Sequence, residues 1–217
     1  MSLKSMHSEQ TTQEPSRQEH YSDYTVKWAT LDWELEQAFA LRRQVFCGEQ
    51  GIFEKDDRDE VDDYAQLLVA VANRGGWHEK IVGTVRIHNE GPRLWWGSRL
   101  AVDQRFRAQI GLGGVLIKLA VSSANALGCD QFFAQVQKRN EKLFQRLNWE
   151  SKFELPVKDH PHVMMEANLD EFPPCYQPKS GFVIKGPRLS NPEDFGLPLL
   201  YPTHKVTDQT GEARQVA

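Results

Sequence analysis

The sequence predicts a mixed α+β fold, with helices packed against one central mixed sheet. Segments typical of buried strands occur in a block before the longest amphipathic helix, whereas a parallel α/β fold would alternate the two. The chain has 217 residues, which at roughly 150 residues per domain allows one compact domain with spare length. Its hydrophobic fraction of 40% is enough to form a core. We therefore expect one folded domain, at residues 23–170.

The first half of this domain is predicted to contain one helix between strands. Residues 24–28 alternate between apolar and polar side chains, as a half-buried strand does. Asp32 can cap a helix that places its apolar residues on one face and is broken by Gly48. Residues 66–72 and 80–87 are apolar enough to form two buried strands that are joined by a turn.

The second half of the domain is predicted to continue the sheet. Residues 94–102 form the next expected strand. An amphipathic helix is predicted over residues 112–128, because apolar side chains recur every three to four residues and a glycine stands at its end. Residues 132–136 predict a strand, Asn140 can cap a short helix, and residues 162–169 are expected to form the last strand.

The composition excludes several classes of protein. Lys and Arg total 26 against 30 Asp and Glu, a net charge of -4, so nucleic acid is not expected as a partner. No apolar segment approaches the roughly 20 residues that span a membrane, and the N-terminus has no signal-peptide core. Cys47, Cys129 and Cys175 form no C-x-x-C pair, which is typical of buried thiols in a reducing compartment. We expect a cytoplasmic protein without membrane contact.

Both ends of the chain differ in composition from the domain. Residues 1–22 are rich in Ser, Gln, Glu and Thr, and their few apolar residues cannot offset the entropy lost on ordering. Residues 171–217 hold seven of the 11 prolines, which exclude long helices and central strands. We expect a disordered N-terminal tail and an extended C-terminal arm, which could contact a partner protein or a second copy of the chain.

Residues 98–119 carry the most informative functional pattern. A strand ends, Arg105 and Arg107 follow, and a glycine-rich turn leads directly into the helix. Glycine lets a ligand approach the backbone closely, and the unpaired N–H groups and the dipole of a helix N-terminus attract anions. The pattern is therefore consistent with a pyrophosphate site. The alternative is that the glycines only let the helix begin close to the sheet.

The order of these motifs resembles the GNAT superfamily of acyl-CoA-dependent N-acyltransferases. L-A-V, an arginine-rich loop, G-L-G-G and an amphipathic helix are followed by a strand and then by N-E-K-L-F-Q-R-L-N-W, across residues 24–169. The resemblance implies a three-layer fold with a mostly antiparallel sheet, in which two central parallel strands splay apart. Acyl-CoA, expected here as acetyl-CoA, would lie between those strands as co-substrate, and no metal is expected.

The same resemblance assigns residues to the acyl-CoA. The backbone of residues 100–102 would contact the pantetheine arm and polarise the thioester carbonyl, and the turn at residues 107–114 would hold the pyrophosphate. Asn140 and Phe144 would lie beside the CoA arm. The full implied set is Leu100, Ala101, Val102, Arg107, Ala108, Gln109, Ile110, Gly111, Leu112, Gly113, Gly114, Asn140 and Phe144.

Two positions depart from the pattern of the superfamily. The signature arginine should stand three residues before the first glycine of the turn, but that residue is Ala108 and the arginine is Arg107. Backbone N–H groups tolerate this change, because an anion cradle needs no particular side chain. Phe144 stands where many members have a tyrosine that protonates the leaving thiolate, and a phenyl ring has no proton to donate. Another group or water would then protonate the thiolate, or it would leave unassisted.

Narrower resemblances point to two branches of the superfamily. The arginine-rich first helix, the acidic segment and S-R-L-A-V resemble acyl-homoserine-lactone synthases, in which Asp63, Arg86 and Arg99 of this chain have counterparts. Trp96 replaces the glutamate that precedes S-R in that pattern, which argues against the same signalling product. S-R-L-A-V and N-x-x-L-F-x-R-L-x-W also resemble a bacterial subgroup encoded in nitrilase-containing gene clusters.

Arg86 and Arg99 interrupt otherwise apolar strands, where an arginine needs a partner. One alternative is an ion pair with the acidic segment, through Glu60, Asp62 or Asp63. The other is that a planar guanidinium binds a substrate carboxylate in a bidentate manner. Both can hold together, so Asp63, Arg86 and Arg99 are the candidate substrate-binding residues.

His88 is the candidate general base, because an imidazole exchanges protons near neutral pH and can deprotonate an ammonium substrate through a water. His160 and His162 have a spacing that can ligate a metal, but the intervening proline and the lack of a nearby third ligand favour a turn. Cys47 is expected to be an inert thiol. The expected catalytic residues are His88, Arg99 and Asn140.

These patterns together predict an N-acetyltransferase, which transfers an acetyl or other acyl group to the amine of a small molecule by direct attack. A carboxylate on that small molecule would suit the two arginines. One alternative is a catalytically silent acyl-CoA-binding sensor or partner protein, suggested by Phe144 and the C-terminal arm. Another is an acyltransferase that uses acyl-carrier protein, suggested by the homoserine-lactone synthase resemblance.

Overall fold

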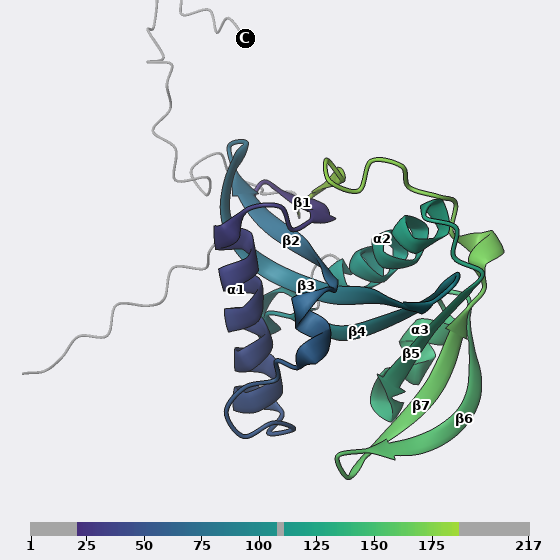
Figure 1. Cartoon of the computed structure of the whole chain (residues 1–217). Coiled ribbons are helices and arrows are strands. Elements are labelled where there is room, and N and C mark those ends of the chain that lie inside the picture. The colour runs from purple at the N-terminus through teal and green to yellow at the C-terminus, as the bar shows by residue number, and fades with distance from the viewer. Residues whose placement is uncertain (1–20, 108–110, 187–217) are drawn as a thin grey trace, which may run out of the picture.

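A computed structural model describes residues 21–107 and 111–186, which form one sheet with helices on both faces (Figure 1). The sheet has eight strands in the order β6-β7-β5-β4-β3-β2-β1-β8. The strands are β1 (Asp23–Trp28), β2 (Gln66–Arg74), β3 (Trp77–Gly91), β4 (Leu94–Val102), β5 (Gln131–Gln137), β6 (Trp149–Val157), β7 (His160–Ala167) and β8 (Phe182–Lys185). The α-helices are α1 (Asp32–Arg43), α2 (Leu112–Ala126) and α3 (Glu141–Gln145), and a π-helical segment, η1 (Gln44–Glu49), continues α1.

The sheet is antiparallel except for one central parallel pair, β4 with β5. These two strands pair only from Leu94 with Gln131 to Gly97 with Ala134, and beyond that point their registered pairing ends. Each strand continues past it, to Val102 and Gln137. The prediction of a mixed, mostly antiparallel sheet with one splayed parallel pair is therefore confirmed.

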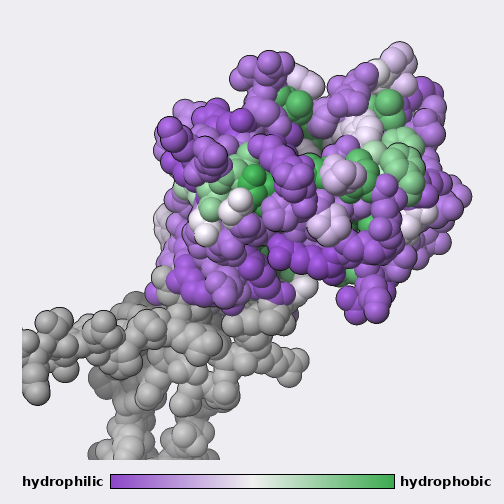
Figure 2. All heavy atoms as spheres, turned by 90° about the horizontal axis from the view of Figure 1, so that it is seen from below, coloured by the Kyte–Doolittle hydropathy of each residue, from purple (hydrophilic) through white to green (hydrophobic). Residues whose placement is uncertain are grey.

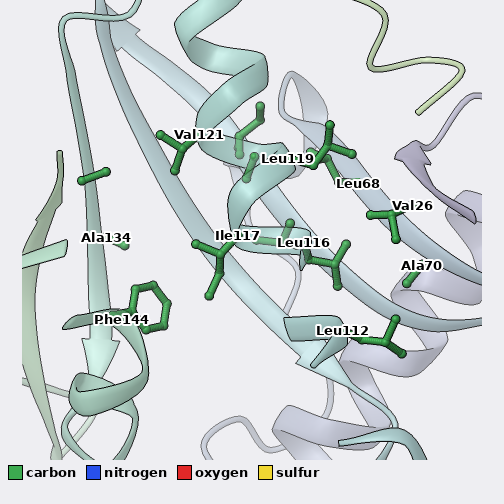
Figure 3. Packing of buried hydrophobic residues seen from close by; sticks show 14 of the residues in the cluster. Val26, Leu68, Ala70, Leu112, Leu116, Ile117, Leu119, Val121, Ala134 and Phe144 are labelled. Atoms are coloured by element: carbon green, nitrogen blue, oxygen red, sulfur yellow. The ribbon is translucent and has the colours of Figure 1, made fainter. Parts of the chain in front are cut away.

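Two apolar clusters, one on each face of the sheet, make the fold three-layered. Alternate residues of β2 supply both clusters, which is why this strand is a continuous apolar run. Leu68 and Ala70 pack on the α2 side, where Figure 3 shows Leu68 near Leu119 and Ala70 near Leu116. Val69 and Val71 pack on the α1 side. Full burial of one such leucine stabilises the fold by about 1.5–3 kcal/mol.

Two strands were not predicted, and both lie at the edges of the sheet. β6 carries Glu150, Lys152 and Glu154, and most of its residues are exposed or half-buried, so it has no apolar run to mark it. Its turn into β7 has positive φ at Lys158 and Asp159, although neither is the glycine that such a hairpin turn favours. β8 is only four residues long. An edge strand has a neighbouring strand on one side only, so fewer of its side chains are buried and its sequence carries a weaker apolar pattern.

The start of α1 differs from the prediction. Asp32 lies inside the first turn, and the side chain that caps the backbone is Glu34. Its carboxylate is fully buried, accepts the N–H groups of Thr30 and Leu31, and forms an ion pair with Lys27 at 2.7 Å. Although burial alone would raise it, these contacts lower the pKa of Glu34. Lys27 on β1 therefore holds the Glu34 carboxylate in place, and Glu34 rather than Asp32 caps the helix.

The predicted tail and arm are described only in part. Residues 1–20 and 187–217 lie outside the described residues, and Tyr21 already packs into the core cluster on the α2 side. Within the predicted C-terminal arm, β8 pairs antiparallel with β1 as the last strand of the sheet. Within the described ranges, no helix is long and apolar enough to cross a membrane. Seen from below, the surface is mostly hydrophilic and its apolar side chains form small separate groups (Figure 2).

Candidate functional site

The separation of β4 from β5 opens a cavity of about 490 Å³, which we call the central cavity. Its lining comes from both faces of the sheet. The polar half lies on the side opposite α2 and includes Arg86, His88, Trp96, Ser98, Arg99 and Gln135. The apolar half lies on the α2 side and includes Ile117, Ala120, Phe132, Ala134, Phe144 and Trp149.

A bulge in β4 lies at the edge of the central cavity. Thr84 pairs with Ala101 and Arg86 with Ser98, so β4 carries one residue more than β3 between these pairs. Within the bulge Arg99 has a φ of 55°, a left-handed conformation that costs about 1–2 kcal/mol in a residue with a side chain. The pattern of alternating residues in β4 is thereby reset at Leu100, the residue predicted to contact the pantetheine.

A second hollow of about 650 Å³, the glycine groove, lies at the N-terminus of α2. The helix begins after Gly111, which has a φ of 66°. An added Cβ would meet no atom within 4 Å at Gly111, only Val102 at 3.9 Å at Gly113, and only Leu147, from 3.7 Å, at Gly114. This open space borders the first N–H groups of α2, which have no partner within the helix. Ala108, Gln109 and Ile110 lie outside the described residues.

Three basic side chains line the glycine groove: Arg107, Lys118 and Arg139. Arg107 donates from Nε to the Val102 carbonyl at 2.8 Å and pairs with Glu49 through Nη2. Lys118 and Arg139 are exposed. The groove thus combines backbone N–H donors, positive charge and open space, which is what a pyrophosphate group requires.

The glycine groove and the central cavity share two residues, Leu100 and Asn140. Leu100 follows the bulge in β4, and Asn140 immediately precedes α3. Phe144, one turn further along, lines the apolar half of the central cavity and packs edge-on against Trp149, with ring centroids 5.1 Å apart. Both residues predicted beside the CoA arm therefore lie at these hollows. Asn140 lies where the two hollows meet, and Phe144 lies in the lining of the central cavity.

Arg86 and Arg99 belong to a cluster of ion pairs, the arginine–aspartate cluster. Its members are Arg42, Arg86, Arg99, Asp57, Asp59 and Asp62. Arg86 contacts Asp59 and lies 3.0 Å from Asp62, while its Nε donates to Ser98 at 2.9 Å. Arg99 donates to the Asp57 carbonyl and, at 2.8 Å, to Asp59. Ion pairing with the acidic segment, one of the two alternatives, is present, but of the predicted partners only Asp62 takes part in the described pairs, and Asp57 and Asp59 stand in place of Glu60 and Asp63.

The electrostatics of the cluster favour the charged form of Asp59 and Asp62. Burial would raise the pKa of Asp59 and Asp62, but hydrogen bonds from Arg86 and Arg42 respectively outweigh it and hold both pKa values below their usual range. Burial and the neighbouring charge of Arg86 lower the pKa of Arg99. Three positive and three negative side chains balance within the cluster. Asp63, a predicted substrate-binding residue, is exposed and outside the lining of the cavity.

His88 lies in the polar half of the cavity and is only 6% exposed. Its Nε2 lies 3.1 Å from a carboxylate oxygen of Glu90, which fixes that nitrogen as a donor, while Nδ1 is buried without a described partner. Trp96 stands opposite on β4, and its indole N–H is also buried and unpaired among the described residues. Two unpaired polar atoms thus lie on neighbouring strands beside one cavity.

His162 was missed as a cavity residue by the sequence analysis. It lies on β7, pairs in register with Gln137 of β5, and lines the central cavity. Its Nδ1 lies 2.8 Å from the His160 carbonyl. A carbonyl only accepts, so Nδ1 carries the proton and Nε2 of the neutral ring carries the lone pair. Alternation along β7 places His162 on the same face as Gln137, but only the pairing of β7 with β5 reveals this.

The cysteines lie outside this chemistry. Cys129 is buried, and burial raises the pKa of its thiol to about 11. Burial, followed by the charge of Asp57, also raises the pKa of Cys47, so its thiol is not activated.

Solved structures share this architecture at low sequence identity. ElaA from Escherichia coli is 17% identical, with a TM-score of 0.56, over 68% of this chain and 99% of its own. An acyl-CoA N-acyltransferase from Pseudomonas aeruginosa is 22% identical, with a TM-score of 0.52, over 67% of this chain and 99% of its own. FeeM, an N-acyl amino acid synthase from uncultured soil microbes, is 11% identical, with a TM-score of 0.55, over 70% and 94%.

The sequence itself identifies the family. Among curated proteins none matches the chain, so the finer placement in the subgroup encoded with nitrilases stays a prediction. Residues 6–149, more than half of the chain, match the family described as Acetyltransferase (GNAT) family. The chain therefore belongs to the GNAT family of acetyltransferases and is an acyl-CoA-dependent acyltransferase.

Proposed function

We propose that this enzyme transfers the acyl group of acyl-CoA to the amine of a small molecule by direct attack. The observation that carries the proposal is the contact of two chemically different hollows at Leu100 and Asn140. One hollow suits a phosphate-bearing donor and the other offers polar groups to an acceptor. Holding both reactants at one junction supplies much of the acceleration in such a reaction.

The glycine groove would hold the donor. Open space at Gly113 and Gly114 lets a pyrophosphate approach the first N–H groups of α2. Lys118 and Arg139 border that space, and Arg107 would exchange Glu49 for a phosphate oxygen. In this exchange Arg107 would lose its exposed ion pair with Glu49, which is worth at most about 1 kcal/mol.

His88 would act as the general base in the polar half of the cavity. Its pairing with Glu90 leaves the lone pair on Nδ1, which has no described partner. A carboxylate on the far nitrogen also stabilises the imidazolium that forms when the amine loses its proton. The N–H of Trp96 is available to an acceptor atom on the same substrate.

The position and free donors of Arg99 favour an amine substrate that carries a carboxylate. Its bonds to the acidic segment use Nε and Nη2, which leaves the donors of Nη1 for a ligand. The side chain is 19% exposed and lines the central cavity. Because the cluster is balanced in charge, recognition would come from hydrogen-bond geometry rather than from excess positive charge.

Departure of the thiolate would need no tyrosine. Phe144 offers no proton, and the Asn140 amide at the junction could donate a hydrogen bond to developing negative charge. A thiol with a pKa near 8.5 is itself a fair leaving group.

Thiol release from acyl-CoA, measured across a panel of amines with and without a carboxylate, tests the proposal. We expect turnover with carboxylate-bearing amines and a pH profile in which the acidic limb disappears in His88→Gln, whose amide can keep the bond to Glu90. His78→Gln, an exposed histidine at the start of the same strand, is the matched control. Tight CoA binding without turnover on any amine would instead indicate a sensor.

A further inference from the structure

We propose that the acyl group carried by the donor is longer than acetyl, and that its chain occupies the apolar half of the central cavity. The inference rests on the proposed function, because it assumes that the thioester lies at the junction of the two hollows. It concerns a different part of the molecule, the side of the junction that faces α2.

The walls of the apolar half come from four elements. Ile117 and Ala120 belong to α2, Phe132 and Ala134 to β5, Phe144 to α3 and Trp149 to β6. Figure 3 shows Ile117, Phe144 and Ala134 close together, and all three line the cavity. None of these six residues is more than 7% exposed, so the space lies within the core rather than on the surface.

Small residues keep this space open. Ala120 and Ala134 are small residues within its lining. Gly97 also lies in the lining, and the Phe132 ring packs so closely on it that an added Cβ would lie 2.9 Å from the ring. An unfilled apolar cavity destabilises a core, since its walls lose contacts that close packing would supply. A core that keeps such a space beside a reaction site is adapted to an apolar ligand.

The position of the space defines the ligand. It opens on Leu100 and Asn140, the residues shared with the glycine groove, so its occupant is attached to the donor. The amine and any carboxylate belong in the polar half, where Arg99, His88 and Ser98 lie. An alkyl chain has no polar atoms to pair, and matches walls made of aliphatic and aromatic side chains.

The first test is a series of donors with one fixed amine: acetyl-, butanoyl-, hexanoyl-, octanoyl- and decanoyl-CoA. Each methylene buried should raise kcat/KM by about fourfold until the space is full. We expect hexanoyl-CoA to exceed acetyl-CoA by at least about tenfold, and decanoyl-CoA to fall below the optimum. A steady decline from acetyl-CoA onward would overturn the inference.

A matched pair of variants locates the effect. Ala120→Leu fills the apolar half from α2, and should lower kcat/KM for hexanoyl-CoA at least about tenfold while acetyl-CoA changes by less than about threefold. Ala126→Leu makes the same change on the same helix at a half-buried residue outside the cavity lining, and should alter neither. Equal losses with both donors in Ala120→Leu, in a variant that still melts cooperatively, would count against the chain site.

Binding of unreactive thioethers separates this inference from the proposed function. S-ethyl-, S-hexyl- and S-decyl-CoA cannot transfer their chains, so calorimetry reports affinity without catalysis. If no acyl-CoA supports turnover but affinity rises from S-ethyl- to S-hexyl-CoA, the proposed function fails and the chain site stands. If turnover occurs but S-ethyl-CoA binds as tightly as S-hexyl-CoA, the chain site fails alone.

Discussion

The arginine–aspartate cluster and the glycine groove both place basic side chains beside the central cavity, but these side chains are paired differently. In the cluster, three arginines contact three aspartates, and Arg42 is fully buried. In the groove, Lys118 and Arg139 are exposed beside open space, and only Arg107 has a described carboxylate partner. The guanidinium groups of the cluster are already paired and form part of the cavity lining, whereas basic side chains without a carboxylate partner can bind a ligand. Anion sites are therefore located by free donors rather than by counting basic residues.

The largest effect is expected from Arg42→Met. The substitution removes one of the two arginine partners of each buried carboxylate, since Asp57 keeps only Arg99 and Asp62 keeps only Arg86 among the described residues. Removing one partner of a buried pair costs about 3–5 kcal/mol. Arg43→Met, the neighbouring residue, removes an exposed pair with Asp56 and should cost less than about 1 kcal/mol. Urea unfolding monitored by tryptophan fluorescence measures both. Similar midpoints for the two variants would mean that the cluster does not stabilise the fold.

Acid should weaken the cluster selectively. Asp59 and Asp62 have pKa values below those of an unfolded chain, so the unfolded state takes up more protons as the pH falls. Their contribution to stability is complete above about pH 5 and is lost progressively below about pH 4. Unfolding free energies measured from pH 6 to pH 3 should fall less steeply for Asp59→Asn than for the parent. Asp63→Asn, an exposed neighbour outside the cluster, should follow the parent curve.

A substitution in the glycine groove should have the opposite effect, weakening the binding of acyl-CoA while the stability of the fold is kept. In Gly113→Ala the new methyl group occupies the space assigned to the donor, and the KM for acyl-CoA should rise about tenfold. Alanine in a helix is favoured over glycine by about 0.5–1 kcal/mol, so the variant should melt no lower than the parent. Gly48→Ala, in η1 with open space around its Cβ position, should leave KM unchanged. Reduced stability with an unchanged KM would assign Gly113 a packing role.

The smallest effect is expected from Glu49→Gln. Removing this carboxylate frees Arg107 and leaves the groove more positive, so the KM for acyl-CoA should fall about two- to threefold. The gain should shrink at high salt, because the groove is open to solvent. An unchanged KM at low salt would show that Arg107 does not take part in binding the donor.

The sequence predicts site features that adjacent residues form better than it predicts contacts between residues far apart along the chain. The turn before α2 combines the left-handed Gly111 with a helix start, and both signals lie within a few adjacent residues. Asp59 lies 27 residues from Arg86 and Asp57 lies 42 residues from Arg99, so these pairings depend on how the acidic segment folds over β3 and β4. His162 enters the cavity only because β7 returns beside β5.

The short strand β8 has a consequence for how the chain can be shortened. Its four residues cover the outer edge of β1, and Gly181 before it approaches so closely that an added Cβ would lie 2.0 Å from the Val26 carbonyl oxygen. A truncation before Phe182 would retain every residue assigned here to catalysis, yet it would uncover a row of unpaired backbone groups along β1. Such an open edge recruits strands from other molecules, so the shortened enzyme should aggregate before it loses its chemistry.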